Sequence, residues 1–384
     1  MEITCEKNVF SQALATAARA INSRSPLPIL SHVLMQAEEG RLRLSATDLD
    51  LGVLTEIPTD ITESGSVACP AKLLQEIVSK LPGAPIRFRS HHDGRIEIHC
   101  GRSRFEISTL PSEEFPSLPR RSEGIQIRLP HKQLKAMIRR VALATASADE
   151  SRAVMTGVLI KLSGQEMTMV ATDGRRMACH IYHCADFSGD GMQVIVPGRA
   201  LQEVVRLLTD TDELVELSLA EGQLHCQVGE VSLHCRLLEG TFPDYKRVLP
   251  KSFQRSCRIG REAFLGGLQR MLVLAQEKQS PNLIVLEVTE GQMAISANTP
   301  DVGVGQEEIA MVLEGEPLKI AFNGRYIADA LTILEAEEVE IQFQDDSKSA
   351  VLSPFGEEGY SYVLMPVRLR EAISEEAAVA SSAI

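Results

Sequence analysis

Aspartate residues recur in three short polar segments, and they are the side chains that could most readily do chemistry. Asp48 and Asp50 lie in the first segment, Asp173 in the second and Asp301 in the third. Carboxylates can hold Mg²⁺ in a nuclease or another metal-dependent hydrolase. These segments are far apart in the sequence, so their carboxylates would belong to separate domains and could not share one ion. Aspartate also favours tight turns, because its side chain accepts backbone hydrogen bonds, and a turn is the simpler interpretation.

Neighbouring histidine and cysteine residues are a second group that could bind a metal. The best-spaced set is Cys179-His180 with His183-Cys184, and similar neighbours occur at 99–100, 225–226 and 234–235. A strand places adjacent side chains on opposite faces, so such neighbours cannot ligate one ion together. The eight cysteines include no C-x-x-C pair and do not predict a disulfide framework. We therefore expect no metal and no cofactor.

The sequence also lacks the common catalytic motifs. It has no Walker loop, no H-E-x-x-H helix and no G-x-S-x-G elbow. Together with the turn interpretation of the aspartates, this predicts a protein that is not an enzyme.

The segment 171–178 (ATDGRRMA) shows how the chain is organised. It follows the alternating sequence 166–170, which predicts a strand, and Asp173-Gly174 is typical of a tight turn because glycine accepts a positive φ. Arg175 and Arg176 then begin the next strand. The same pattern occurs at 46–53 and at 297–304, so a period of about 125 residues identifies three copies of one unit.

Each copy contains a helix, several strands, a second helix and further strands. Apolar residues spaced by three and four predict the first helix at 8–21, and Pro70 begins a second helix at 70–81. The corresponding helices are predicted at 131–145 and from 197 in the second copy, and at 261–275 and 324–335 in the third. Predicted strands of the first copy are 33–37, 41–46, 53–57, 86–90, 95–100 and 103–109. The expected fold class is α+β, with three tandem domains at 1–121, 127–249 and 256–369 and a disordered tail at 370–384.

Composition and charge narrow the function further. The chain of 384 residues is 44% hydrophobic and 24% charged, and no apolar run approaches the roughly 20 residues of a membrane span. The acidic amino terminus lacks the features of a signal peptide, so we expect a cytoplasmic protein. The net charge of −13 argues against a nucleic-acid partner unless the charges are segregated. Basic residues do concentrate on the predicted helices, and acidic residues on loops.

Five motifs in order resemble the bacterial DNA sliding clamps, the beta subunits of DNA polymerase III. They are PLPIL at 26–30, GRSRF at 101–105, ATDG at 171–174, FPDYKRVLP at 242–250 and VLMP at 363–366, and the resemblance covers 1–369. It implies a head-to-tail homodimer that closes six similar domains into a ring. Helices would line the hole and hold duplex DNA without sequence specificity. A protein-binding scaffold that does not encircle DNA is the alternative.

The resemblance also implies residues for DNA contact and for the dimer interface. Asp149 is excluded because an acid repels phosphate. The expected DNA-binding residues are Arg24, Lys72, Lys135, Arg139, Arg199, Arg206, Arg270 and Arg325. The expected interface pairs Phe105 and Ile107 with Val273 and Leu274, and adds Lys72, Arg102 and Arg104 opposite Asp301, Glu307 and Glu308. Burial of Phe105 and Ile107 in their own domain is the alternative.

A pocket for the peptide tails of partner proteins is the last feature that the resemblance implies. Its apolar residues would hold a Leu or Phe anchor, and its methionines suit several partners. The expected partners are the DNA polymerase III alpha subunit, the clamp loader, translesion and repair polymerases and mismatch-repair proteins on the nucleoid. The expected pocket residues are Arg152, Met155, Thr172, Gly174, Arg175, Arg176, Met177, Pro243, Arg247, Val248, Asn323, Tyr326, Val363, Leu364, Met365, Pro366, Val367 and Arg368. Ordinary core packing of the apolar members is the alternative.

Overall fold

The computed structural model describes residues 1–22, 26–91, 93–119, 124–147, 149, 152–183, 189–220, 222–250, 252–275, 282–299 and 302–368. The chain divides into two compact units. Unit 1 comprises Met1–Ala136, Leu162–Gln165 and Cys184–Glu239, and unit 2 comprises Met137–Lys161, Glu166–His183 and Gly240–Ile384. The tail expected at 370–384 lies outside the described residues.

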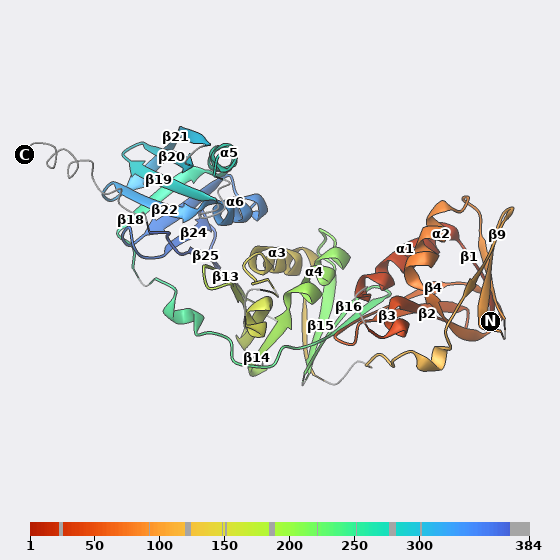
Figure 1. Cartoon of the computed structure of the whole chain (residues 1–384). Helices are drawn as coiled ribbons and strands as arrows, with labels where there is room; N and C mark the ends of the chain where they lie inside the picture. Colours follow the sequence, from red (N-terminus) through yellow and green to blue (C-terminus); the bar gives the residue numbers. More distant parts are fainter. Residues whose placement is uncertain are drawn as a thin grey trace, which may run out of the picture. The chain divides into compact units, whose positions relative to one another are not determined.

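Six α-helices and twenty-five strands make up the described part of the chain (Figure 1). The helices are α1 (Lys7–Ala17), α2 (Ala71–Lys80), α3 (His131–Ala142), α4 (Gly198–Leu207), α5 (Arg261–Leu272) and α6 (Gly324–Ile333). The strands of the first copy are β1 (Glu2–Cys5), β2 (His32–Glu38), β3 (Arg41–Thr47), β4 (Leu51–Pro58), β5 (Asp60–Glu63), β6 (Gly65–Pro70), β7 (Ile86–Ser90), β8 (Arg95–Cys100) and β9 (Ser103–Ser108). Those of the second are β10 (Ile125–Pro130), β11 (Gly157–Gly164), β12 (Glu166–Thr172), β13 (Arg176–His183), β14 (Gly189–Pro197), β15 (Leu214–Ala220), β16 (Gln223–Val228) and β17 (Val231–Arg236). The third copy contributes β18 (Arg255–Gly260), β19 (Leu283–Thr289), β20 (Gln292–Thr299), β21 (Gly303–Glu314), β22 (Leu318–Asn323), β23 (Glu338–Phe343), β24 (Ala350–Pro354) and β25 (Tyr360–Leu364).

Unit 1 contains two antiparallel sheets. One has the order β5-β1-β7-β8-β9, and the other has the order β10-β15-β16-β17-β4-β3-β2-β6. The second sheet joins two copies of the repeat, because β17 pairs with β4 and places Leu233 opposite Val53. Helices α1 and α2 pack on each other and on this sheet. The segment after β9 is held to β6 by paired backbone hydrogen bonds between Ala68 and Leu110.

Unit 2 is built around one long sheet, in which β11, β12, β13, β25, β24, β23, β18, β21, β20, β19 and β22 follow one another. The pairing of β13 with β25 again joins two copies of the repeat and sets Met177 opposite Val363. Helices α5 and α6 pack together, and α5 also packs on β20 and β21. Buried Phe264, Phe322 and Tyr362 belong to the core of this unit.

The periodicity of the sequence predicted these elements well. Strands β7 and β8 have the predicted bounds, and all six predicted helices are present. The helices end earlier than predicted where the last turn tightens. After α3, the amide of Ala144 donates to the carbonyl of Val141, and after α5 that of Leu274 donates to Met271, both three residues back. Pro70 precedes α2 as its N-cap residue and does not lie in its first turn.

No helix among the described residues is long and apolar enough to cross a membrane.

Candidate functional site

A cavity of about 130 Å³ lies within unit 2, beside the turn between β12 and β13. Its walls come from that turn, from the start of β13, from the end of β25 and from the segment after Phe242. Most of the lining is apolar, and its polar groups lie mainly at the turn. The lining residues are Met155, Thr172, Gly174, Arg176, Met177, Pro243, Tyr245, Val248, Val363 and Met365. A slot of this kind can accept one apolar side chain of a peptide.

Hydrogen bonds to two side chains fix the turn beside the cavity. The Thr172 hydroxyl donates to the carbonyl of Arg176 (2.8 Å) and accepts from the amide of Gly174 (3.1 Å). The Asp173 carboxylate accepts from the amides of Arg175 (2.8 Å) and Arg176 (2.9 Å). Gly174 has φ 85°, which glycine adopts without strain. This is the turn function that the sequence predicted for Asp173.

The turn of the first copy has the same hydrogen bonds. Thr47 donates to the carbonyl of Leu51 (2.9 Å) and accepts from the amide of Leu49 (3.0 Å). Asp48 accepts from the amides of Asp50 (3.2 Å) and Leu51 (2.8 Å). The difference is at the third residue, where Leu49 adopts φ 81° despite its branched side chain. The repeat therefore conserves the turn geometry and not the glycine.

Arg176 links the turn to two other elements of unit 2. Its side chain is 12% exposed and forms ion pairs with Asp173 (3.0 Å) and with Asp329 of α6 (3.2 Å). It also donates to the hydroxyl of Tyr362 on β25 (3.3 Å) and lies over the ring of Tyr326, 4.3 Å from its centre. Burial acts to lower the pKa of Arg176, but Tyr362 and Asp173 outweigh it, so the pKa is raised. The guanidinium stays charged.

The exposed edge of the cavity is formed by the residue that follows β25. The amide of Met365 donates to the carbonyl of Arg175 (3.0 Å), and its side chain is 40% exposed, whereas Val363 is buried. Arg247 lies outside the cavity, 85% exposed at its side chain and paired with Asp244 (2.9 Å). An apolar slot with an exposed arginine next to its lining residue Val248 suits a peptide that carries an apolar anchor and acidic groups.

The cavity brings together nine of the predicted pocket residues. These are Met155, Thr172, Gly174, Arg176, Met177, Pro243, Val248, Val363 and Met365. The other predicted residues do not line it: Arg152, Arg175, Arg247, Asn323, Tyr326, Leu364, Pro366, Val367 and Arg368. Two of them lie next to the lining residue Arg176: Leu364 is buried opposite it in the strand ladder, and the Tyr326 ring packs on its guanidinium. Sequence reasoning missed Tyr245, although it lies two residues after Pro243 in the same motif.

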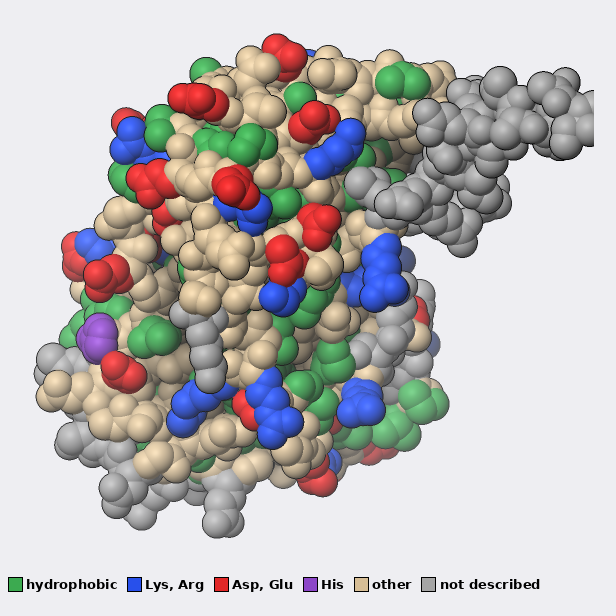
Figure 2. All heavy atoms as spheres, turned by 90° about the vertical axis from the view of Figure 1, so that its left-hand side faces the viewer, with side chains coloured by type: hydrophobic (Ala, Val, Ile, Leu, Met, Phe, Trp, Pro, Cys, Tyr) green, Lys and Arg blue, Asp and Glu red, His purple; other side chains and the backbone are tan. Residues whose placement is uncertain are grey.

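Most of the residues expected to bind DNA form ion pairs within their own unit. Lys72 and Arg139 are exposed on α2 and α3, and Arg24 lies outside the described residues. The remaining pairs are Lys135 with Asp210 (2.9 Å), Arg199 with Asp48, Arg206 with Glu203, Arg270 with Glu307, and Arg325 with Asp329 (3.1 Å). On the face drawn in Figure 2, acidic and basic side chains are likewise interspersed. Local pairing reduces the field that each cation presents to phosphate.

The residues expected at a dimer interface occupy exposed edges of the two units. In unit 1, β9 is an edge strand on which Phe105 is 39% exposed, whereas Ile107 is buried. Lys72 and Arg102 are exposed, and Arg104 pairs with Glu97. In unit 2, Val273 is 68% exposed and Glu308 is exposed, whereas Leu274 is half-buried and Glu307 pairs with Arg270. Asp301 lies outside the described residues.

Among the described residues of unit 2, part of strand β21 is paired on one side only. Residues 303–310 pair with β20 on one side, and pairing with β18 on the other side begins only at Met311. Val304, in this stretch, is 73% exposed. An open strand edge with exposed apolar side chains is a ready surface for another chain.

The candidate Cys179–Cys184 metal set is not assembled in the described residues, and Cys184 lies outside them. Cys179 and His180 are both buried, on opposite faces of β13. Burial raises the pKa of the Cys179 thiol to about 11 and lowers the pKa of His180 to about 4, the latter with help from Arg140. Each therefore stays neutral near pH 7.

Comparison with known proteins gives one consistent family. Three family models match in succession, described as the N-terminal, central and C-terminal domains of the DNA polymerase III beta subunit, over residues 1–119, 128–244 and 246–368. The chain is similar to the beta sliding clamp of Synechococcus elongatus, at 33% identity over 96% of this chain and 100% of that protein. It is also similar to the beta sliding clamp of Staphylococcus aureus, at 32% identity over 96% and 99%.

Solved structures agree with this result. The crystal structure of the DNA polymerase sliding clamp from Bacillus subtilis matches with a TM-score of 0.92 and 28% identity, over 96% of this chain and 100% of that one. The sliding clamp of Pseudomonas aeruginosa bound to griselimycin matches with a TM-score of 0.90 and 31% identity over the same shares.

Proposed function

Since the chain belongs to the family of DNA polymerase III beta subunits, the bacterial sliding clamps, we propose that two copies close head to tail into a ring around duplex DNA. It is a DNA sliding clamp, a non-catalytic processivity factor of replication. Three tandem clamp domains with antiparallel sheets form the chain. Duplex DNA and a DNA polymerase are the partners that membership of this family implies.

The observation that carries the ring proposal is the pair of exposed strand edges. Strand β9 ends the five-stranded sheet of unit 1, and residues 303–310 of β21 are open on one side in unit 2. Pairing β9 of one copy with β21 of another would cover both edges. Such a contact joins two different surfaces, and two of them close a ring. The proposed domains are 1–121, 127–249 and 256–369. Of the residues expected to bind DNA, Lys72 and Arg139 are the two described as exposed for which the ion pairs given above name no carboxylate, and we propose that they contact phosphate.

A retention experiment tests encirclement. The protein is loaded onto nicked circular DNA by a bacterial clamp loader, and the complex is separated from free protein by gel filtration in high salt. We expect the clamp to stay on the circle and to leave after one restriction cut, because salt removes phosphate attraction and leaves only topology. Equal retention on circular and linear DNA would contradict encirclement. Absence from both would favour a scaffold that binds proteins alone.

We further propose that the 130 Å³ cavity of unit 2 holds the peptide tails of partners. These partners are the polymerase III alpha subunit, the clamp loader, translesion and repair polymerases and mismatch-repair proteins, acting in the cytoplasm on the nucleoid. The apolar lining of Met155, Met177, Val363 and Met365 supports this proposal. The pocket is contained in one unit, so it does not depend on ring closure.

Peptide binding is tested with a labelled tail peptide of a polymerase III alpha subunit. Met365→Ala combined with Pro366→Ala should weaken binding by roughly tenfold or more, since Met365 lines the cavity and loss of its contact with the peptide anchor costs about 1.4 kcal/mol or more. Val312→Ala, an exposed valine elsewhere in unit 2, is the matched control and should bind normally. Unchanged affinity in the double variant would remove the cavity from the proposal.

A further inference from the structure

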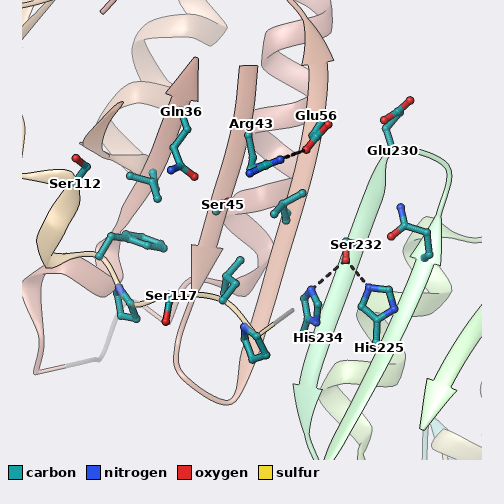
Figure 3. Close-up of a pocket in the computed structure, with 17 residues that line it drawn as sticks. Gln36, Arg43, Ser45, Glu56, Ser112, Ser117, His225, Glu230, Ser232 and His234 are labelled. Atoms are coloured by element: carbon teal, nitrogen blue, oxygen red, sulfur yellow. Dashed lines mark hydrogen bonds and ion pairs between the residues drawn. The ribbon is translucent and has the colours of Figure 1, made fainter. Parts of the chain in front are cut away.

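A second and larger cavity, of about 870 Å³, lies within unit 1 on the face of the eight-stranded sheet (Figure 3). Its floor is formed by side chains of β2, β3, β4, β16 and β17, and its wall by the segment 112–119. The segment 112–119 contributes the apolar residues Phe115, Pro116 and Leu118, whereas the lining residues of β16 and β17 are polar. The sliding-clamp function assigns nothing to this space.

Two histidines meet at the polar side of this cavity. His225 of β16 and His234 of β17 are directly opposite each other in the antiparallel ladder, and their ring centres are 4.6 Å apart. The Nε2 atom of His225 lies 2.8 Å from the Ser232 hydroxyl oxygen, and the Nε2 atom of His234 lies 3.1 Å from the same oxygen. Both ring nitrogens therefore converge on one point at the cavity wall (Figure 3).

The protonation of this cluster leaves nitrogen lone pairs available. A hydroxyl has one proton, so it can donate to only one of the two nitrogens, and the other ring donates its Nε2 proton to the oxygen. That ring can present a lone pair instead when its proton moves to Nδ1, which changes the tautomer and not the charge.

The remaining charges of the cavity are close to balanced. Arg43 pairs with Glu56 (2.7 Å), and Glu230 pairs with Arg41 (2.8 Å). Arg43, Glu56 and Glu230 lie above the histidines, on β3, β4 and the β16–β17 turn (Figure 3). Among the described residues that line the cavity, the arginine is therefore balanced by a carboxylate and does not present an uncompensated charge to a metal ion.

We propose that His225 and His234 bind one first-row transition-metal dication that prefers imidazole, such as Zn²⁺, Ni²⁺ or Cu²⁺. Two imidazole nitrogens that face one point are ligands for these ions and not for Mg²⁺ or Ca²⁺, which prefer oxygen. Ser232 would rotate from its present position and leave the point to the ion. Among the described residues no group of three or more His, Cys, Asp or Glu side chains could hold a metal. Water therefore completes the coordination, and the bound ion is exchangeable.

The experiment uses the full chain after treatment with a chelator. Cu²⁺ is titrated into the protein, and electron paramagnetic resonance is recorded at each addition. We expect one tight equivalent per chain, with hyperfine coupling to two imidazole nitrogens. His225→Gln and His234→Gln should each weaken this binding by roughly tenfold or more, as loss of a metal partner does. Glutamine keeps a polar group at each position, and the unfolding midpoint of each metal-free variant reports whether it still folds.

His183→Gln is the matched control, because His183 is a histidine of another strand whose side chain is 78% exposed. This variant should bind Cu²⁺ as the natural chain does, and Mg²⁺ should not compete in any of them. Zn²⁺ should raise the unfolding temperature of the natural chain and not that of the double variant. The proposal is overturned if the double variant keeps the tight equivalent, or if the natural chain has none.

Discussion

At the scale of the residue, the most informative position is Leu49. It occupies the place that Gly174 occupies in the second copy, with φ 81° against 85°. A left-handed backbone costs a residue with a β-carbon roughly 1–2 kcal/mol, whereas glycine adopts it freely. Leu49 is 58% exposed, so packing does not repay this cost. The hydrogen bonds from Thr47 and Asp48 hold the strained turn in place.

Leu49→Gly should therefore stabilise the chain. The free energy gained by relieving the backbone strain exceeds the free-energy cost of ordering a glycine, which is more flexible in the unfolded chain. We expect the free energy of unfolding to rise by about 0.5–1 kcal/mol. Gly174→Ala is the matched reverse change and should destabilise by about 1 kcal/mol or more, with no steric clash, since its added carbon would lie 3.6 Å from Met155. Urea unfolding measures both. A loss of stability in Leu49→Gly would show that the leucine side chain holds the turn.

His180 predicts a dependence of stability on pH. The ring is buried, its Nδ1 atom has no hydrogen-bond partner among the described residues, and its pKa is lowered from 6.5 to about 4. Between these values the unfolded chain binds a proton and the folded chain does not. Stability is therefore lost as pH falls from about 6.5 to about 4, by up to roughly 3 kcal/mol.

His180→Phe should reduce the slope of this part of the pH profile, because phenylalanine cannot bind the proton in either state. Part of the slope should remain, because burial also lowers the pKa of His234 to about 4. The exposed His183 provides the control, and His183→Phe should keep the slope. The measurement is the urea midpoint at a series of pH values. If His180→Phe retains the full slope, the proton is bound elsewhere.

At the scale of the element, the Arg176 cluster joins the β12–β13 turn, β25 and α6. Its partners Asp173, Asp329 and Tyr362 come from these three elements. Arg176→Met should cost roughly 3 kcal/mol, because it leaves carboxylates without their buried cation, and it should also weaken peptide binding by loosening the turn. Arg325 also pairs with Asp329, but its side chain is 67% exposed. Arg325→Ala should therefore lower the free energy of unfolding by no more than about 0.5 kcal/mol. Equal losses in both variants would contradict a special role for Arg176.

Prediction from sequence succeeded where a pattern is local. Alternation predicted β7 and β8, the spacing of apolar residues predicted the first helix of each copy, and proline and the repeat predicted the second helix. The Arg176 cluster could not be predicted in the same way. It depends on the register that sets Arg176 opposite Leu364, and neither alternation nor helix spacing fixes the pairing of strands so far apart. Ion pairs such as Arg199 with Asp48 are also long-range, which is why the basic helices looked less compensated in sequence than they are in the structure.

At the scale of the whole molecule, the proposed ring makes a prediction about mass. The chain has a mass of 42.0 kDa, so a dimer has about 84 kDa. Val273→Asp places a charge on a side chain that is 68% exposed at the proposed interface, and should convert the dimer to a monomer in sedimentation. Val312→Asp changes a valine that is 51% exposed on the half of β21 already paired with β18, and should remain dimeric. Two dimeric variants would place the interface elsewhere.

The sequence repeat did not predict that the middle copy is divided between two compact units. A period of about 125 residues predicted three domains, and three domain models match in succession. The contacts between neighbouring copies nevertheless group the chain into two compact units. The reason is that strands pair across the repeat boundaries, β17 with β4 and β13 with β25. The middle copy thus shares one sheet with the first copy and another with the third.

These shared sheets affect how the gene can be cut and recombined. A fragment of the middle copy alone would expose β17 without β4 and β13 without β25, and bare strand edges of this kind associate with other chains. Each unit is also discontinuous in sequence, so no single cut releases it intact. We expect the middle copy to fail as a transplantable module. A substitution in β13 or β17 must therefore also suit the strand of the neighbouring copy with which it pairs.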